Sequence, residues 1–221
     1  MELTNKPLYL VTDRTGLTDN VFFQRLDLAC QAGVDLVQLR EKNLESRDYF
    51  QLAQRVKTIT DRYAVPLVID DRLDIAEAVE AAGVHVGQSD LPVAVVRQIL
   101  GPGKLIGVTA KTVAQADLAV TEGADYLGVG AIFPTTTHVK TVRTSVETLA
   151  EIKKRVPIPV YAIGGLKAHN VAVIQPAHVD GVAVVSAIMQ APDTVAETKA
   201  LRTAVLKAVL VFPCNLPALR A

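Results

Sequence analysis

A short polar segment directly after an apolar run is the first candidate for chemistry in this chain. Residues 34–37 read Val-Asp-Leu-Val, and the five residues that follow are Gln38, Leu39, Arg40, Glu41 and Lys42. Side chains alternate between the two faces of a strand, so Gln38 and Arg40 point the same way and Lys42 extends the row into the next loop. Two cations and an amide would then converge on one anionic ligand. A solvated strand end without such a role is the alternative.

The elements that must position this segment follow a regular alternation. Short runs rich in Val, Ile and Leu alternate with longer amphipathic stretches, a pattern typical of parallel strands joined by helices. Eight strands are predicted, at residues 8–12, 36–40, 67–70, 84–87, 105–110, 126–132, 160–163 and 181–186. A helix is predicted after each strand, at residues 22–31, 47–63, 73–81, 93–100, 113–122, 146–154, 169–174 and 194–210.

Eight βα units in 221 residues predict an α/β fold, a single (β/α)8 TIM barrel with its active site at the C-terminal ends of the strands. This fold typically has ~250 residues and can be as short as about 200. An open doubly wound sheet is the alternative, but no Gly-x-Gly-x-x-Gly motif opens a first helix. We expect one barrel domain, residues 1–210, and an irregular tail, residues 211–221, because prolines cannot continue the last helix.

The composition argues against several classes of partner. Lys plus Arg and Asp plus Glu both number 23, so no overall basic field attracts nucleic acid or an anionic membrane. Residues 1–7 lack the layout of a signal peptide and the apolar runs are too interrupted to span a bilayer, so we expect a cytoplasmic protein. Cys30 and Cys214 form no metal or redox spacing and are assigned no role.

Polar residues and glycines recur where the predicted strands end, which is where a TIM barrel builds its active site. Asp71 and Asp90 follow adjacent strands and could face one hard cation, Mg²⁺ or Mn²⁺, because two carboxylates plus substrate phosphate oxygens are a common set of ligands. Arg40 and Lys42 could neutralise the remaining charge of a diphosphate. The alternative is that each Asp only caps the helix that follows it.

A second anion site is predicted on the other side of the barrel mouth. Gly164, Gly165 and Ser186 mark the ends of the seventh and eighth strands, where barrels commonly bind a phosphate through backbone N–H groups. Thr135 and Thr137 would add hydroxyl donors, although a Thr-rich turn is a simpler interpretation of that run. Two separate anion sites, one of them with metal ligands, suggest a reaction that joins a diphosphate ester to a monophosphate ester.

Taken together, these motifs resemble those of the thiamine-phosphate synthase family, and the similarity runs in order from Leu8 to about Met189. The corresponding motifs lie at residues 38–42, 71–72, 85–90, 107–110, 134–137, 163–165 and 184–188. The resemblance implies a transferase of thiamine biosynthesis, which couples hydroxymethylpyrimidine diphosphate to hydroxyethylthiazole phosphate. The products would be thiamine phosphate and diphosphate, and the cofactor would be Mg²⁺.

The resemblance also implies a role for individual residues. The pyrimidine diphosphate would be bound by Gln38, Leu39, Arg40, Glu41, Lys42, Asp70, Thr109 and His138. The thiazole phosphate would be bound by Thr135, Thr136, Thr137, Gly165, Val185 and Ser186. Asp71 and Asp90 would hold one Mg²⁺ per subunit, and Arg40, Lys42 and Thr109 would take part in catalysis. His85, at the start of a strand, is expected to pack rather than to bind a ligand.

The sequence departs from the family pattern at two of these positions. Residue 70 is Asp where the family usually has Asn, and residue 138 is His where it usually has Lys. An imidazole is only partly protonated near neutral pH, whereas a lysine is charged throughout the physiological range. Lys140, two residues further on, could supply the missing charge. Thr109 stands where many relatives have Ser and keeps the hydroxyl group.

The mechanism that the resemblance implies needs no protein nucleophile. The electron-rich aminopyrimidine tolerates a developing cation, so its carbon–oxygen bond breaks first and the thiazole nitrogen then attacks. The sequence accordingly has no serine or cysteine elbow. Alternatives are a thiazole tautomerase-like enzyme, another phosphate-binding barrel such as an epimerase or aldolase, and a non-catalytic relative that binds thiazole phosphate. We expect small-molecule substrates as partners, and a homo-oligomer is possible.

Overall fold

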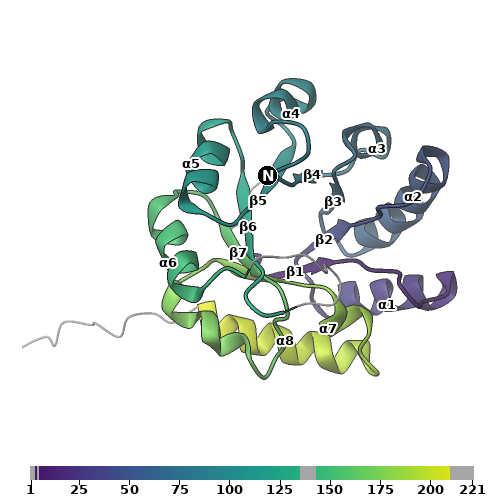
Figure 1. Ribbon diagram of the computed structural model, residues 1–221. Coiled ribbons are helices and arrows are strands. Elements are labelled where there is room, and N and C mark those ends of the chain that lie inside the picture. The colour runs from purple at the N-terminus through teal and green to yellow at the C-terminus, as the bar shows by residue number, and fades with distance from the viewer. Residues whose placement is uncertain (1–2, 4, 135–142, 210–221) are drawn as a thin grey trace, which may run out of the picture.

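The computed structural model of this chain describes residues 3, 5–134 and 143–209, and its strands form one closed barrel (Figure 1). Eight parallel strands pair in the order of the sequence, and β8 pairs with β1 to close the sheet. The strands are β1 Leu8–Val11, β2 Leu36–Leu39, β3 Leu67–Asp70, β4 Gly83–Val86, β5 Leu105–Ala110, β6 Tyr126–Gly130, β7 Val160–Ile163 and β8 Gly181–Val184. The predicted TIM barrel is confirmed.

Helices surround the strands, as the ring of coiled ribbons in Figure 1 shows. They are α1 Asp19–Ala32, α2 Ser46–Arg62, α3 Leu73–Ala78, α4 Val93–Leu100, α5 Val113–Thr121, α6 Val146–Arg155, α7 Ser186–Met189 and α8 Thr194–Val209, with a 3₁₀ helix, η1 Val171–Ala177, between β7 and β8. Side-chain oxygens of Thr18, Thr112 and Ser145 accept backbone N–H groups and cap α1, α5 and α6.

The elements depart from the predicted ones mainly at their ends. The eighth strand ends at Val184 rather than at Ser186, because Ser186 begins the short helix α7, which the sequence analysis missed. The helix predicted at residues 169–174 is the 3₁₀ helix η1 and contains Pro176. Proline removes a backbone donor from an α-helix, so the tighter, shorter form is favoured there.

Two apolar layers hold the barrel together. Residues on the outer faces of the strands, such as Val37 and Leu39, pack against the helices in one continuous core. Residues on the inner faces form a second cluster inside the barrel, which contains Tyr9, Tyr126 and Tyr161. Both faces of every strand are therefore covered, as expected for a parallel sheet.

Glycines make room for the three tyrosine rings in the barrel interior. The rings of Tyr9, Tyr126 and Tyr161 pack edge to face, with centroids 5.5–5.9 Å apart. Gly107 on β5 faces this cluster, and a Cβ there would lie 2.1 Å from Tyr126 Cζ and 2.5 Å from His85 Nδ1. Gly107 is therefore needed for the close approach of its neighbours, and the register of β5 beside β4 and β6 depends on it.

Gly107→Ala tests this requirement. We expect it to lower the free energy of unfolding by about 1–3 kcal/mol, because the added methyl overpacks a closed interior. Gly103→Ala is the matched control, since a Cβ at Gly103 meets no heavy atom within 4 Å, and surface changes of this kind stay within about 0.5 kcal/mol. Urea unfolding of both variants measures the difference, and equal stabilities would contradict the packing argument.

Candidate active site

A lysine held between two carboxylates is the centre of the charged cluster at the ends of β2 and β3. Lys42 Nζ lies 2.6 Å from Asp70 Oδ2 and also contacts Asp71 Oδ2. Arg40 Nε lies 3.9 Å from the same oxygen of Asp70. The Arg40 backbone N–H donates to Thr12 Oγ1 at 3.2 Å, which ties the end of β2 to the end of β1. The structure therefore brings Arg40, Lys42, Asp70 and Asp71 together, as the sequence predicted.

Burial and charge act in opposite directions in this cluster. Only 7% of the Asp70 side chain is exposed. Burial raises the pKa of Asp70, attraction to Lys42 and Arg40 only partly offsets that, and repulsion by Asp90 adds to it. Partial burial lowers the pKa of Lys42, but attraction to Asp70 and Asp71 outweighs this effect, so its pKa is raised. Lys42 is therefore a firmly protonated cation at the barrel mouth.

Asp71 and Asp90 do not cap the helices that follow them. The residue before α3 is Arg72 and the residue before α4 is Pro92, and neither cap has a side-chain hydrogen bond. Asp90 Oδ2 instead accepts the Gly87 backbone N–H at 2.7 Å, across its own loop. Asp71 has a left-handed backbone, φ 59°, which Asp tolerates better than most residues and which is frequent at functional sites.

Asp71 and Asp90 fit a cation site in which the protein supplies two carboxylates and the substrate supplies further ligands. Within residues 3, 5–134 and 143–209, no group of three or more His, Cys, Asp or Glu side chains is placed to hold a metal ion. Mg²⁺ usually binds through one or two carboxylates and takes its other ligands from water and substrate phosphates. Asp71 contacts Lys42, and Asp90 is close enough for its charge to raise the pKa of Asp70, so two hard oxygen donors near the cluster match that arrangement.

Polar side chains continue from this cluster into the barrel interior. Gln38 is buried and its Nε2 donates to the Tyr9 hydroxyl at 2.6 Å. Thr109 Oγ1 lies 3.0 Å from His85 Nε2. Burial lowers the pKa of His85 to about 4, and the nearby positive charge of Lys42 adds to this, so the imidazole is neutral at neutral pH. His85 thus packs inside the barrel, as predicted, while also contacting a predicted site residue.

The opposite side of the mouth is built from backbone rather than from charge. Gly164 and Gly165 follow β7 with φ 106° and 64°, conformations that glycine adopts without strain. A Cβ on Gly165 would lie 2.7 Å from Phe133 Cβ, so the position is also crowded. Asn170 holds the loop: its Nδ2 donates to Gly165 O at 3.0 Å and its Oδ1 accepts the Lys167 N–H at 2.7 Å. Sequence reasoning missed Asn170.

Val185 and Ser186 stand next to this loop, at the end of β8. Both are partly exposed, and Val185 precedes the short helix α7 that Ser186 begins. β7 and β8 are adjacent strands in the barrel, so Gly165, Val185 and Ser186 meet at one part of the rim. Thr135, Thr136, Thr137 and His138, together with Lys140, lie outside the described residues.

Two predicted substrate-binding residues make their contacts within the protein. Leu39 is fully buried against the helices, and its carbonyl accepts the Tyr49 hydroxyl at 2.9 Å. Glu41 faces Arg14, with Arg14 Nη1 3.6 Å from Glu41 Oε1. Burial raises the pKa of Glu41, and attraction to Arg14 opposes that rise. These contacts hold the backbone of residues 38–42 in place. The binding roles predicted for Leu39 and Glu41 stay predictions.

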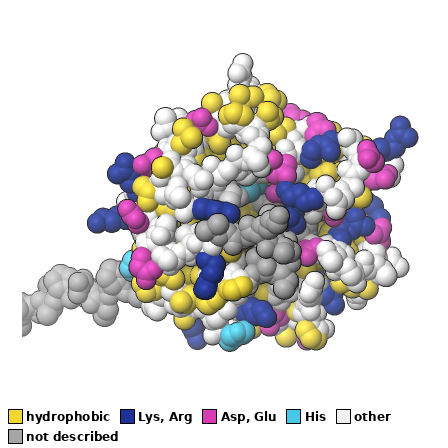
Figure 2. All heavy atoms as spheres, viewed as in Figure 1, with side chains coloured by type: hydrophobic (Ala, Val, Ile, Leu, Met, Phe, Trp, Pro, Cys, Tyr) yellow, Lys and Arg dark blue, Asp and Glu magenta, His cyan; other side chains and the backbone are white. Residues whose placement is uncertain are grey.

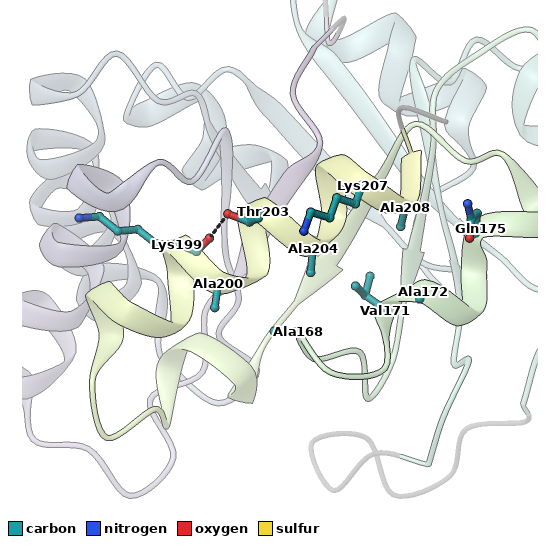
Figure 3. A pocket seen from close by; sticks show the side chains of 10 residues that line it. All are labelled: Ala168, Val171, Ala172, Gln175, Lys199, Ala200, Thr203, Ala204, Lys207 and Ala208. Atoms are coloured by element: carbon teal, nitrogen blue, oxygen red, sulfur yellow. Dashed lines mark hydrogen bonds between the residues drawn. The ribbon is translucent and has the colours of Figure 1, made fainter. Parts of the chain in front are cut away.

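The charged cluster and one open pocket of the barrel lie in different places. Figure 2 shows Lys, Arg, Asp and Glu side chains side by side near the centre of one face. A pocket of about 730 Å³ lies instead on the outside, between η1 and α8 (Figure 3). It is lined by Ala168, Val171, Ala172, Gln175, Lys199, Ala200, Thr203, Ala204, Lys207 and Ala208, none of which is a predicted site residue. Pocket size alone does not locate this site.

Comparison with known proteins shows the family of this chain. The family model described as thiamine monophosphate synthase matches residues 8–188. The chain belongs to this family. Thiamine-phosphate synthase of Lacticaseibacillus paracasei is 54% identical over 210 residues, which cover 95% of this chain and 98% of that protein. Thiamine-phosphate synthase 2 of Streptococcus pneumoniae is 53% identical, over 87% of this chain and 92% of its own length.

A solved structure extends the similarity to three dimensions. Thiamine phosphate pyrophosphorylase from Pyrococcus furiosus superposes with a TM-score of 0.84 at 34% identity, covering 92% of this chain and 97% of that one. The family resemblance and the fold expected from the sequence are both confirmed. The assignment of individual site residues stays a prediction, supported by where the described side chains lie.

Asp70→Asn tests how the negative charge of Asp70 affects the binding of diphosphate to the cluster. We expect inorganic diphosphate to bind roughly tenfold more tightly in EDTA, because the change removes a negative charge within reach of Lys42 and Arg40. Asp74→Asn is the control, since Asp74 is exposed and pairs with Arg72. Isothermal titration calorimetry compares both variants with the unchanged protein. Weaker or unchanged binding in Asp70→Asn would show that Asp70 does not compete for the cations.

Proposed function

We propose that the protein condenses hydroxymethylpyrimidine diphosphate with hydroxyethylthiazole phosphate, releasing thiamine phosphate and diphosphate. The observation that carries this proposal is the cluster of Arg40, Lys42, Asp70 and Asp71 at the ends of β2 and β3. Asp90, in the loop after β4, is close enough for its charge to raise the pKa of Asp70. The high identity to thiamine-phosphate synthases over nearly the whole chain supports it. A thiazole tautomerase-like enzyme would have no use for a diphosphate site of this composition.

The charged side of the mouth suits the leaving group. As a diphosphate binds, Lys42 can transfer its donors from Asp70 and Asp71 to phosphate oxygens, and Arg40 can donate two parallel N–H groups. These contacts strengthen as the carbon–oxygen bond breaks, because negative charge then accumulates on the departing diphosphate. Thr109 stands near the end of β5, and its hydroxyl would bind the pyrimidine or its diphosphate.

Asp71 and Asp90 would hold Mg²⁺ together with oxygens of the diphosphate. When bound, the ion would neutralise charge on the leaving group. Lys42 contacts Asp71, and Arg40 lies 3.9 Å from the neighbouring Asp70, so both cations would add to the positive environment. Asp70 is too deeply buried and too closely paired with Lys42 to serve chiefly as an exposed ligand, which fits a role in positioning Lys42.

The uncharged side of the mouth suits the second substrate. Backbone N–H groups near Gly165, Val185 and Ser186 can bind the thiazole phosphate without side-chain cations. Thr135, Thr136 and Thr137, outside the described residues, are proposed to complete this site. The two substrates would then approach each other across the mouth, and their alignment lowers the barrier to attack by the thiazole nitrogen.

Further expectations belong to the same proposal. The substrates are small molecules, and we propose that the reaction takes place in the cytoplasm. No helix among the described residues is long and apolar enough to cross a membrane. The division into a barrel domain, residues 1–210, and a tail, residues 211–221, and the option of a homo-oligomer stay predictions.

One assay tests the proposed function directly. The purified protein is incubated with both substrates and Mg²⁺, and thiamine phosphate and diphosphate are measured together. We expect equal amounts of the two products, and no diphosphate when the thiazole phosphate is replaced by inorganic phosphate. A protein that isomerises the thiazole ring, or binds it without turnover, would release no diphosphate in either mixture.

Asp71→Asn and Asp90→Asn test the metal assignment. Each change is expected to lower turnover by about a hundredfold or more, because metal stabilisation of the leaving group contributes several kcal/mol, and the fold should persist because both residues are partly exposed. Asp61→Asn is the control, since Asp61 lies on the exposed face of α2 and pairs with Lys57. Turnover is measured over a series of Mg²⁺ concentrations. Unchanged turnover in both site variants would contradict the assignment of Asp71 and Asp90 as metal ligands.

A further inference from the structure

An unbroken row of polar contacts crosses the barrel interior and joins two predicted site residues. Gln38 Nε2 lies 2.6 Å from the Tyr9 hydroxyl, which lies 2.9 Å from the Tyr126 hydroxyl. Tyr126 is 3.3 Å from His85 Nδ1, and His85 Nε2 is 3.0 Å from Thr109 Oγ1. The row passes through five strands, β2, β1, β6, β4 and β5. It begins and ends at the barrel mouth.

The interior members of this row have almost no access to water. Tyr9 is 1% exposed, Tyr126 0% and His85 8%. A buried polar group without a partner is costly, so each proton in the row must be used by a neighbour. Gly107 makes this possible, because any larger residue there would occupy the space in which Tyr126 and His85 meet.

Two directions use every proton in the row, and donation from Gln38 Nε2–H to the Tyr9 hydroxyl selects one of them. Gln38 Nε2–H donates to Tyr9, so the Tyr9 proton goes on to Tyr126. The Tyr126 proton then goes to His85 Nδ1, which makes Nδ1 the acceptor and places the imidazole proton on Nε2. His85 Nε2–H donates to Thr109 Oγ1. The Thr109 hydroxyl proton is left to donate outward.

We propose that Tyr9, Tyr126 and His85 are positioning residues that form a hydrogen-bond relay and set the polarity of Gln38 and Thr109. With Nε2 engaged inward, Gln38 offers its Oε1 as an acceptor. With its oxygen accepting from His85, Thr109 offers its hydroxyl as a donor. This rests on the proposed function, because an aminopyrimidine diphosphate needs an acceptor for its amino group and a donor for its phosphate oxygens.

Reversing every bond of the relay gives the opposite polarity. Gln38 Oε1 would then face inward, His85 would carry its proton on Nδ1, and the Thr109 proton would be spent on His85. The amide could offer only donors to the amino group of the substrate, and the hydroxyl could not donate to the diphosphate. The tautomer of His85 therefore reports the direction of the whole relay.

Nitrogen NMR of the ligand-free protein measures that tautomer without any assay of activity. Long-range proton–nitrogen spectra of labelled protein distinguish the two imidazole nitrogens, and His85→Asn identifies the His85 signals among the four histidines. We expect a neutral ring with its proton on Nε2. A neutral ring with its proton on Nδ1, or a charged ring, overturns the relay as drawn. This result is independent of whether the proposed reaction occurs.

Tyr126→Phe tests the relay in turnover, because it removes the central hydroxyl and keeps the ring. We expect kcat to fall roughly tenfold, the effect of losing one buried hydrogen bond from a network, with the KM for thiazole phosphate unchanged. Tyr161→Phe is the matched control: Tyr161 packs in the same aromatic cluster, but its hydroxyl donates to the Lys6 carbonyl outside the row. Its kcat should stay at the level of the unchanged protein.

The outcomes separate the relay from the function. Equal kcat values for Tyr126→Phe and Tyr161→Phe would overturn the relay, provided that urea unfolding shows both variants to be folded. Absence of thiamine phosphate from the unchanged protein would overturn the proposed function, and the NMR result would still decide the polarity of the relay. If Tyr126→Phe fails to fold, the tautomer measured in the unchanged protein remains the deciding test.

Discussion

The space inside an eight-stranded barrel is the constraint on which the rest of this structure depends. Such a barrel is filled by side chains and has no open channel. In this chain, three tyrosines fill much of it, and glycines such as Gly107 on neighbouring strands leave room for them. Tyrosine brings a hydroxyl into a region without water, so polar partners must follow it inside. The same tyrosines therefore fill the barrel and make hydrogen bonds that orient polar side chains at its rim.

A second constraint is the balance of charge at the mouth. Arg40 and Lys42 face three carboxylates, Asp70, Asp71 and Asp90, so the cluster has one more negative than positive charge before any ligand binds. Such a cluster favours a divalent cation and disfavours a bare diphosphate. Asp70 adds one of the negative charges, at a position where the family resemblance leads us to expect Asn. Binding of metal and of diphosphate should therefore be more strongly coupled here than in a relative with Asn.

The sequence predicted the barrel because its signals are local and repeated. Alternating runs such as 36–40 and 105–110 indicate parallel strands, and the shared direction of those strands brings their ends to one rim. The same logic placed Arg40, Lys42 and Asp71 together. It could not show that Leu39 packs in the core between the strands and the helices, or that Glu41 pairs with Arg14. The reason is that a contiguous motif does not reveal the contacts that each of its side chains makes within the protein.

Contacts between residues far apart in sequence were beyond that reasoning. Tyr9 and Tyr126 are separated by 117 positions, and each on its own reads as an apolar core residue. Their hydroxyls meet only in the closed barrel, at 2.9 Å. The register of the sheet also puts Gly107 between His85 and Tyr126, so that these two side chains meet. The signal available in the sequence was the tyrosine and histidine at inward positions of strands whose neighbours carry glycine at the same level. A polar atom on an inward-facing aromatic residue must find a partner, and the strand register determines which residue that is.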